Sequence, residues 1–430
     1  MKSSIINIGD ELLIGQVVNT NAAYMSQALT SAGIAVGEVC TVGDDAAAIE
    51  HAVRRTVSDS DVVLVTGGLG PTKDDITKTV LCRMFGSELC ENPDALANVE
   101  RLFAQRGIAL TDTNRRQALV PRCCEVINND LGTAPCMWFD IGSQWLNEGN
   151  QLISNSCRKV LVALPGVPFE MEYLMSCKII PLLRERFEMG CIVCKNIILQ
   201  GIGESFLSDM LESVESAMPQ NIKLAYLPQA GMIKLRLTAT GDSHDSLQDA
   251  VGRCVRDIHA VASDYIVGED FESIPDIVAD LFVRRALTLA TAESCTGGRI
   301  ASLLTAKPGA SRYFKGGVVS YCNEIKHDML GVQQTTLDKF TAVSEETARE
   351  MAEGVRNRFG TGYGIATTGV AGPSGGSDGV PVGTVWVAVA SPTGTNAKKM
   401  FYTGRRQQII DRAVNEVLAM LVRNINTFTH

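Results

Sequence analysis

The sequence lacks any long hydrophobic run. None of its apolar stretches approaches the roughly 18 residues that a membrane-spanning helix needs, so the sequence predicts no membrane partner. The first residues, MKSSIINIGDELL, also lack the apolar core and cleavage site of a signal peptide and pass directly into an apolar strand. We therefore expect a cytoplasmic protein.

Positive charge and paired cysteines are also scarce. The formal net charge of −9 argues against general binding to nucleic acid, because such binding requires a basic face that neutralises phosphates. The thirteen cysteines are scattered and odd in number, which fits a reducing compartment. Cys191 and Cys194 form one C-x-x-C with no second pair at zinc spacing, so core packing explains them better than a metal does.

What the sequence does contain is enough length for about three domains, with an ordinary globular composition. It has 430 residues, of which 45% are hydrophobic and 20% are charged. Short apolar strands alternate with amphipathic helices from Ser4 onward, which predicts an α/β fold built on a doubly wound sheet. Such sheets bind ligands beyond the carboxyl ends of their strands, so the loops that follow strands are the candidate sites.

The sharpest signal in the first half is a loop after the expected strand at residues 61–66. It reads GGLGPTKDDIT from Gly67 to Thr77. Its glycines let backbone N–H groups approach a phosphate, and the helix that follows adds partial positive charge. Asp74 and Asp75 add carboxylates, which lie beside phosphates only where a divalent cation bridges them. The loop predicts metal-assisted attack of water on a pyrophosphate, although helix capping by Asp75 and Thr77 explains it equally well.

Several reactive side chains lie close together in residues 292–326, AESCTGGRIASLLTAKPGASRYFKGGVVSYCNEIK. Ser294 lies where an expected strand at residues 287–290 passes into a helix opened by Gly297 and Gly298. The N–H groups of that helix would favour an anion or an oxyanion. A loop carries Ser311, and a second expected strand spans residues 317–322.

The end of that second strand adds a possible proton-transfer group. Tyr321 and Asn323 are two residues apart and are expected to share one face, and Lys326 follows. A lysine of lowered pKa can be the base for a serine nucleophile, and a tyrosine can relay the proton. The residues alone fit ordinary structural roles better, such as a helix cap for Ser294 and a solvated Lys326.

A second glycine-rich loop follows the expected strand at residues 364–367. It runs from Thr368 through Gly369 to Ser377 and is suited to wrapping a phosphate. Arg405 and Arg406 then precede the last helix, where positive charge is slightly unfavourable. That misfit favours a ligand role for at least one arginine, which would hold a phosphomonoester by charge-assisted hydrogen bonds.

Residues 273 to 428 resemble the C-terminal amidase domain of the CinA (competence/damage-inducible) family. The resemblance rests on AESCTGG, PGASRYFKGGVVSYCNEIK, TTGVAGPSGG and PVGTVW, in this order. It implies hydrolysis of the carboxamide of nicotinamide mononucleotide without a cofactor. Ser311 is then the expected nucleophile, with Ser294 as the alternative, and Lys326 is the expected base acting through Tyr321. The remaining implied roles are oxyanion or substrate contacts by Gly297, Gly298, Asn323, Thr368, Gly369 and Arg406.

Residues 5 to 171 resemble the molybdopterin-binding fold and, with the amidase domain behind them, the N-terminal half of CinA proteins. The motifs are GDELLIGQVVNTN, TGGLGPTKDDIT, GTAP and LPGVPFEM. The resemblance implies an ADP-ribose pyrophosphatase that depends on a divalent metal and potassium, with Asp74 and Asp75 as metal ligands. The implied substrate contacts are Asp10, Glu11, Asn21, Gly68, Gly70 and Thr77. Cys136 stands where the family usually has glycine, so a narrower pocket or an altered backbone is expected there.

The middle segment resembles the KH-like domain of CinA proteins. We expect three domains at residues 1–188, 189–268 and 269–430. The Gly-x-Gly at Gly201 is not a basic GXXG clamp, which argues against RNA binding and for a spacer, a dimerisation element or a cover for the first pocket. The family also implies a homodimer. Two other functions stay open: a non-catalytic adaptor for DNA recombination and a molybdopterin-binding protein.

Overall fold

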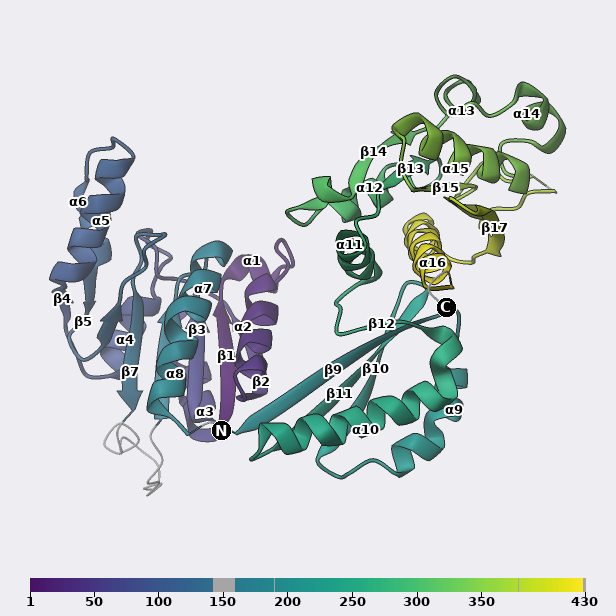
Figure 1. Cartoon of the computed structure of the whole chain (residues 1–430). Helices are drawn as coiled ribbons and strands as arrows, with labels where there is room; N and C mark the ends of the chain where they lie inside the picture. Colours follow the sequence, from purple (N-terminus) through teal and green to yellow (C-terminus); the bar gives the residue numbers. More distant parts are fainter. Residues whose placement is uncertain (142–158, 189, 378, 428–430) are drawn as a thin grey trace. The chain divides into compact units, whose positions relative to one another are not determined.

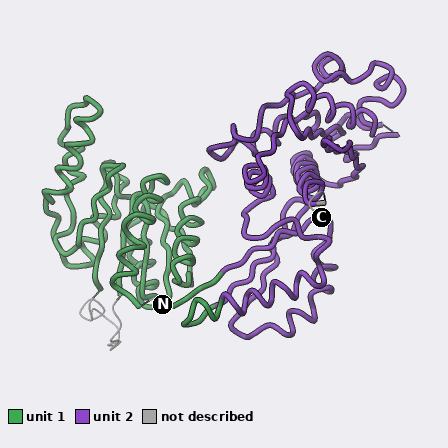
Figure 2. Tube along the Cα trace, viewed as in Figure 1, with its two compact units in different colours: residues 1–193, 240–247 green, residues 194–239, 248–430 purple. Residues whose placement is uncertain are grey.

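The computed structural model describes residues 1–141, 159–188, 190–377 and 379–427, which form two compact units (Figure 2). Unit 1 comprises residues 1–193 and 240–247, and unit 2 comprises residues 194–239 and 248–430. Within the described ranges, no helix is both long and apolar enough to cross a membrane.

Unit 1 is built on a six-stranded sheet with the strand order β2-β1-β3-β8-β7-β6 (Figure 1). Strands β2, β1, β3 and β8 are parallel, whereas the pairs β8·β7 and β7·β6 are antiparallel. The bounds are β1 Lys2–Ile8, β2 Ala35–Val42, β3 Val62–Thr66, β6 Glu125–Ile127, β7 Cys136–Ile141 and β8 Lys159–Leu164. The doubly wound sheet is therefore present, with an antiparallel edge that the sequence did not predict.

Helices cover both faces of this sheet because the strands are apolar on both sides. Ile5 packs with residues of α2, α7 and α8, while the next residue, Ile6, packs with residues of α3 and α4. The chain is helical without a break from Pro168 to Arg186, and a π-helical stretch, Met175–Ile179, joins α7 to α8. The helices are α1 Asp10–Leu13, α2 Thr20–Ser31, α3 Ala46–Asp59, α4 Thr77–Met84, α5 Pro93–Gln105, α6 Asp112–Arg115, α7 Pro168–Leu174 and α8 Ile180–Arg186. A separate small sheet pairs β4 Leu89–Glu91 with β5 Leu119–Pro121.

The KH-like segment forms a four-stranded sheet with the order β10-β11-β9-β12. Its strands are β9 Cys191–Gln200, β10 Ile222–Gln229, β11 Met232–Gly241 and β12 Ile266–Glu269, and its helices are α9 Glu204–Ser216 and α10 His244–Ala262. The sequence did not predict β10, because Pro228 and weak alternation hide the strand.

The last part of unit 2 is a five-stranded sheet with the order β14-β13-β15-β16-β17 (Figure 1). Strands β14, β13 and β15 are parallel, and β16 and β17 are antiparallel additions. One apolar core includes residues of α11 and α16, and another includes residues of α15. The strands are β13 Leu289–Glu293, β14 Phe314–Val319, β15 Tyr363–Gly369, β16 Thr384–Ser391 and β17 Gly394–Phe401. The helices are α11 Ile274–Arg284, α12 Arg299–Thr305, α13 Asn323–Leu330, α14 Gln334–Phe340, α15 Glu345–Phe359 and α16 Arg406–Thr427.

The end of one strand differs from the sequence prediction in a way that matters for the site. The strand expected at residues 317–322 ends at Val319, and the chain then turns into α13 with Cys322 as its N-cap. Tyr321 and Asn323 therefore do not share a strand face, and Lys326 lies on a helix.

Candidate functional site

The first candidate site lies at the carboxyl ends of the parallel strands β14, β13 and β15. Ser294 follows β13 directly, and its backbone N–H donates to Thr367 O of β15 at 3.0 Å. Lys326 lies on α13, and its Nζ donates to Ser320 O, just beyond β14, at 2.9 Å. Because β13 has a parallel neighbour on each side, the chain leaves this edge in different directions, and parallel sheets commonly bind ligands at such a point.

Ser294 and Lys326 form a buried hydroxyl–amine pair at this edge of the sheet. Lys326 Nζ lies 3.1 Å from Ser294 Oγ, and the two residues are only 2% and 8% exposed, respectively. Burial lowers the pKa of Lys326 from its usual 10.5, outweighing the opposite effect of Cys322, Cys295 and Glu324. A neutral amine can accept a hydroxyl proton, so the pair has the geometry of a serine nucleophile with a lysine base.

The helix N-terminus beside Ser294 is already occupied by the carboxylate of Glu293, which is 1% exposed. It accepts four hydrogen bonds at 2.7–3.0 Å, from Gly298 N, Ile300 N, Ala301 N and Thr296 Oγ1. The N–H of Gly297 donates to Ser294 O at 3.1 Å. This corrects the expectation that Gly297 and Gly298 bind an oxyanion, because internal acceptors already satisfy both N–H groups.

Tyr321 pairs with an arginine instead of the lysine. Its side chain is 64% exposed, and its hydroxyl accepts a hydrogen bond from Arg406 Nη2 at 2.9 Å. Arg406 also donates through Nη1 to Gly372 O of the glycine-rich loop at 2.7 Å. In the described part of the chain, no hydrogen bond joins Tyr321 to Lys326. The structure therefore brings the predicted arginine, loop and tyrosine together.

The other predicted residues of this site lie around the pair without touching it. Ser311 is exposed in a 3₁₀ turn, Ala310–Arg312, and its hydroxyl makes no hydrogen bond to a described residue. Asn323 is exposed at the start of α13. Thr368 is buried and donates to Ala342 O at 2.6 Å, and Gly369 ends β15. Of the two candidate serines, only Ser294 is placed against Lys326.

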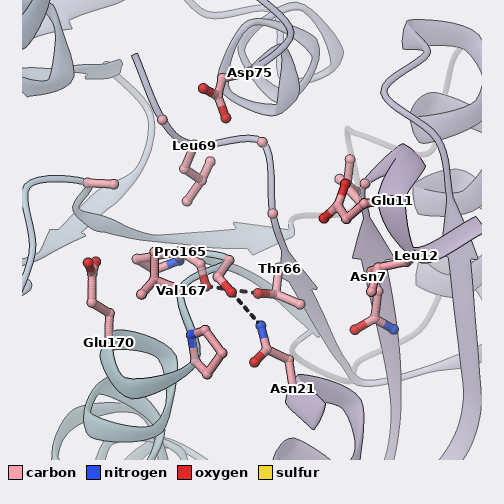
Figure 3. Close-up of a pocket in the computed structure, with 18 of the residues that line it drawn as sticks. Asn7, Glu11, Leu12, Asn21, Thr66, Leu69, Asp75, Pro165, Val167 and Glu170 are labelled. Carbon is pink, nitrogen blue, oxygen red and sulfur yellow. Dashed lines mark hydrogen bonds between the residues drawn. The ribbon is translucent and has the colours of Figure 1, made fainter. Parts of the chain in front are cut away.

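The second candidate site is a cavity of about 470 Å³ in unit 1 (Figure 3). It lies beyond the carboxyl ends of β1 and β3, where β1 is flanked by β2 on one side and β3 on the other. Asn21 Nδ2 donates to Gly166 O at 2.7 Å, and Thr66 Oγ1 donates to Pro165 O at 2.9 Å, as drawn in Figure 3. These bonds join the end of β3 and the start of α2 to the loop after β8.

The loop after β3 is folded tightly onto α4. Gly68 has a φ of 65°, and a Cβ there would lie 2.2 Å from Thr77 Oγ1. Thr77 Oγ1 in turn donates to Gly67 O at 2.9 Å. A Cβ on Gly70 would lie 2.5 Å from Asp75 Oδ2. Gly68 and Gly70 are therefore needed to build this wall, and Thr77 holds the loop closed.

The carboxylates of Glu11, Asp44 and Asp74 line the cavity, and Asp10, which does not line it, contacts Asp44. Asp10 and Asp44 are joined by two hydrogen bonds, from Asp10 N to Asp44 Oδ2 at 3.1 Å and from Asp44 N to Asp10 Oδ1 at 3.3 Å. Burial raises the pKa of Asp44, and the charges of Asp10, Glu11 and Asp74 raise it further, against the lowering effect of the hydrogen bond. A bound cation would relieve this repulsion.

These carboxylates do not form a ready-made metal centre. Among the residues that the structure describes, no three His, Cys, Asp or Glu side chains are arranged to hold a metal ion. The predicted ligand Asp75 accepts hydrogen bonds from Thr72 N, at 2.9 Å, and from Thr72 Oγ1. Magnesium commonly takes only one or two carboxylates beside water and phosphate. One or two of the carboxylates of Glu11, Asp44 and Asp74, which line the cavity, fit such a partial ligand set better than Asp75 does.

Cys136 does not narrow this cavity, contrary to expectation. It is fully buried in β7 and packs in a core with Ile5 and Trp138. The preceding residues Thr133 and Ala134 line the cavity instead.

Sequence reasoning assigned no site role to several residues that line the cavity, among them Asn7, Asp44, Gln117 and Glu170. A signal existed for two of them. Asn7 interrupts the apolar strand SIINI with a polar side chain, and Asp44 follows the end of β2 by two residues. Glu170 lies in the LPGVPFEM motif, although no role was expected for it, and Gln117 gave no signal because it reaches the cavity only through the tertiary fold.

The chain is a multidomain α/β protein in which two separate sheets each carry a candidate site at the carboxyl ends of their parallel strands. Its first domain is molybdopterin-binding-like. Family models match residues 4–185 as a probable molybdopterin binding domain, 194–268 as a damage-inducible protein CinA KH domain and 271–425 as a CinA C-terminal domain. The chain belongs to the CinA family. This confirms the predicted family and fold class.

Two curated relatives match nearly the whole chain, and a solved structure matches part of it. A CinA-like protein of Flavobacterium psychrophilum is 42% identical over 429 residues, which is 99% of each chain. A CinA-like protein of Cytophaga hutchinsonii is 40% identical over 423 residues, or 98% of each chain. A crystal structure of the competence/damage inducible protein CihA from Agrobacterium tumefaciens is 40% identical, covers 35% of this chain and 92% of its own, and has a TM-score of 0.34.

Proposed function

We propose that the C-terminal domain hydrolyses the carboxamide of nicotinamide mononucleotide to nicotinic acid mononucleotide and ammonia. The observation that most supports amide hydrolysis is the buried pair of Ser294 and Lys326, with 3.1 Å between Oγ and Nζ. The choice of substrate comes from the resemblance of this domain to the CinA amidase. A glycine-rich loop contacted by Arg406 supports a substrate with a phosphate group.

In the proposed reaction, Ser294 Oγ attacks the carboxamide carbon while the neutral amine of Lys326 takes the hydroxyl proton. The C–N bond then breaks, and Lys326 returns the proton to the departing ammonia, which leaves an acyl ester on Ser294. Water attacks this ester as Lys326 accepts a proton from it, and the proton goes back to Ser294 Oγ when the product leaves. This scheme replaces the Ser311 nucleophile expected from the sequence.

Arg406 and Tyr321 have a binding role in this proposal. The guanidinium of Arg406 has N–H groups beyond those that contact Tyr321 and Gly372, and these groups would hold the substrate phosphate. The exposed ring of Tyr321 beside the arginine offers a flat surface for the pyridine ring.

Ammonia release from nicotinamide mononucleotide by the full chain tests the proposal. Wild type should release ammonia, and Ser294→Ala should not, while both keep the same thermal unfolding. Absence of release by a folded wild type would leave the adaptor and molybdopterin-binding functions as the better explanations. Equal release by Ser294→Ala would show that the buried pair is not the reacting centre.

For the N-terminal domain we propose hydrolysis of the ADP-ribose pyrophosphate. The supporting observation is the 470 Å³ cavity between a glycine-rich loop and the carboxylates that raise the pKa of Asp44. One or two of the carboxylates of Glu11, Asp44 and Asp74 would hold a divalent cation, together with water and the substrate phosphates. When bound, that ion would neutralise the phosphates and activate water. The products, AMP and ribose 5-phosphate, are separated by ion-exchange chromatography after incubation with magnesium, with or without potassium. Their absence under both conditions would refute this activity.

Two further proposals concern the assembly of the chain and its KH-like domain. We propose that the chain forms a homodimer and does not bind RNA, as the family resemblance and the net charge of −9 suggest. Sedimentation of the full chain and a gel shift with single-stranded RNA test these two points.

A further inference from the structure

Three amide side chains around the unit 1 cavity carry oxygen atoms that no described donor reaches. They are Asn7 Oδ1, Asn21 Oδ1 and Gln117 Oε1. All three residues line the cavity, and Asn7 and Gln117 are only 0% and 5% exposed. A buried carbonyl oxygen without a donor is unfavourable, and native proteins rarely keep one unless a ligand or water uses it.

The surroundings fix the direction of two of these oxygens. Asn7 Nδ2 donates to Cys40 O of β2 at 3.0 Å, so the Oδ1 atom lies on the opposite side of the amide. That side belongs to β3, since Asn7 pairs with Thr66 in the strand register, and Figure 3 shows the two residues at the cavity. Asn21 is fixed in the same way, because its Nδ2 donates to Gly166 O at 2.7 Å.

The turn that carries Gln117 is also anchored. Lys78 Nζ donates to Gln117 O at 3.1 Å, and Lys78 is itself buried on α4. This bond ties the 3₁₀ turn Arg116–Ala118 to the helix that follows the glycine-rich loop. The Gln117 side chain therefore starts from a backbone held in place and lines the cavity from a different element than Asn7 and Asn21.

We infer that Asn7, Asn21 and Gln117 recognise hydrogen-bond donors on the nucleoside part of the ligand. Acceptors from three separate elements converge on one cavity, and a phosphate has no donor to offer them. An exocyclic base amine or the ribose hydroxyls supply such donors. The three amides thus set the specificity of the pocket whose pyrophosphatase activity is proposed above, and the inference rests on that proposal for the ligand class.

The test measures binding without turnover. The full chain is titrated by calorimetry in EDTA with ADP-ribose, with its inosine counterpart, in which a carbonyl replaces the base amine, and with 2′-deoxy-ADP-ribose. Each lost donor that faced a buried acceptor should weaken binding roughly 5- to 150-fold. The inosine ligand reports on the amine, and the deoxy ligand reports on a hydroxyl.

Variants then assign the effect to the amides. Gln117→Leu and Asn7→Leu should bring the affinity ratio between ADP-ribose and the weaker analogue close to one. Gln117→Glu keeps an acceptor oxygen and should preserve the ratio, although its charge weakens all three ligands alike. Thermal unfolding checks each variant, and Gln117→Leu carries the test if Asn7→Leu does not fold.

Three outcomes would overturn the inference. The first is a wild type that binds all three ligands equally or binds none of them. The second is an unchanged ratio in the folded Leu variants. The third, seen when the titrations are repeated with and without potassium, is a Leu variant that changes only the potassium dependence of binding, which would show that the oxygens bind a cation. Discrimination without hydrolysis would support the inference and refute only the pyrophosphatase proposal.

Discussion

Replacing Lys326 with Met is the most direct test of the amidase site. Methionine keeps a long unbranched side chain but removes the amine that lies 3.1 Å from Ser294 Oγ and 2.9 Å from Ser320 O. A general base typically contributes about 10²- to 10⁴-fold to a rate. The kcat for ammonia release should fall by that factor. KM should change little, because Lys326 is not expected to contact the phosphate.

The same substitution has a distinctive effect on stability. Because burial lowers the pKa of Lys326 below 10.5, the folded chain binds fewer protons than the unfolded chain between the lowered pKa and 10.5. The wild type therefore gains stability as pH rises through that window, by at most about 1.4 kcal/mol per pH unit. The Met variant lacks this gain. At neutral pH it escapes the desolvation cost but leaves Ser320 O without its donor, a loss of about 1–3 kcal/mol.

Two measurements at pH 7 and pH 9 check the predicted loss of rate and the predicted change in stability. The first is the rate of ammonia release, and the second is the free energy of unfolding in urea. The stability of wild type minus that of Lys326→Met should increase between the two pH values if the lowered pKa lies below 9. Lys315→Met, at an exposed position of β14, is the matched control and should change neither rate nor pH dependence. A folded Lys326→Met chain with full activity would refute the proposed base. A stability difference that shrinks with pH would refute the lowered pKa.

Four further substitutions extend the test. Ser311→Ala should keep most ammonia release while Ser294→Ala loses it; the reverse result would restore the nucleophile first expected from the sequence. Arg406→Lys should raise KM for nicotinamide mononucleotide roughly tenfold or more, because a planar fork becomes a single ammonium; an unchanged KM would place the phosphate elsewhere. Asp44→Asn should raise the magnesium concentration needed for half-maximal ADP-ribose hydrolysis. It should not lower the melting temperature at pH 7, because an aspartate whose pKa is raised in the folded state destabilises that state when it is ionised. Gly68→Ala should cost about 1–3 kcal/mol in urea unfolding, because φ is 65° there.

The elements that could be predicted well are those with strong local signals. Helix α15 has such a signal, because Ser344 is a favourable N-cap residue and accepts a hydrogen bond from Thr347 N at 3.2 Å. The strand at residues 287–290 was placed too early, because β13 continues through Thr291 and Glu293. These polar residues are buried, and only tertiary contacts such as the helix cap by Glu293 explain why a strand accepts them.

The candidate site was predictable in its parts and not in its pairing. Ser294 and Ser311 both precede Lys326 in the chain and both lie in or beside loops. No local pattern decides which of the two serines pairs with Lys326. The pairing depends on where α13 begins. The sequence pattern instead predicted that the strand continues to residue 322, immediately before that helix. Once the chain turns at Cys322, Lys326 faces Ser294, while Tyr321 lies on the exposed side with Arg406.

Both sites arise from one property of parallel sheets, which explains why their positions could be predicted before their contacts. In each sheet a strand has parallel neighbours on both sides, so the connections leave in different directions and expose the carboxyl edge. Asn7 is the last residue but one of one such strand, and Ser294 follows the other directly. The strands behind these residues are buried and constrain packing, while the edge itself is free to carry polar groups. Substitutions at the edge should therefore change binding or rate far more than they change the free energy of unfolding.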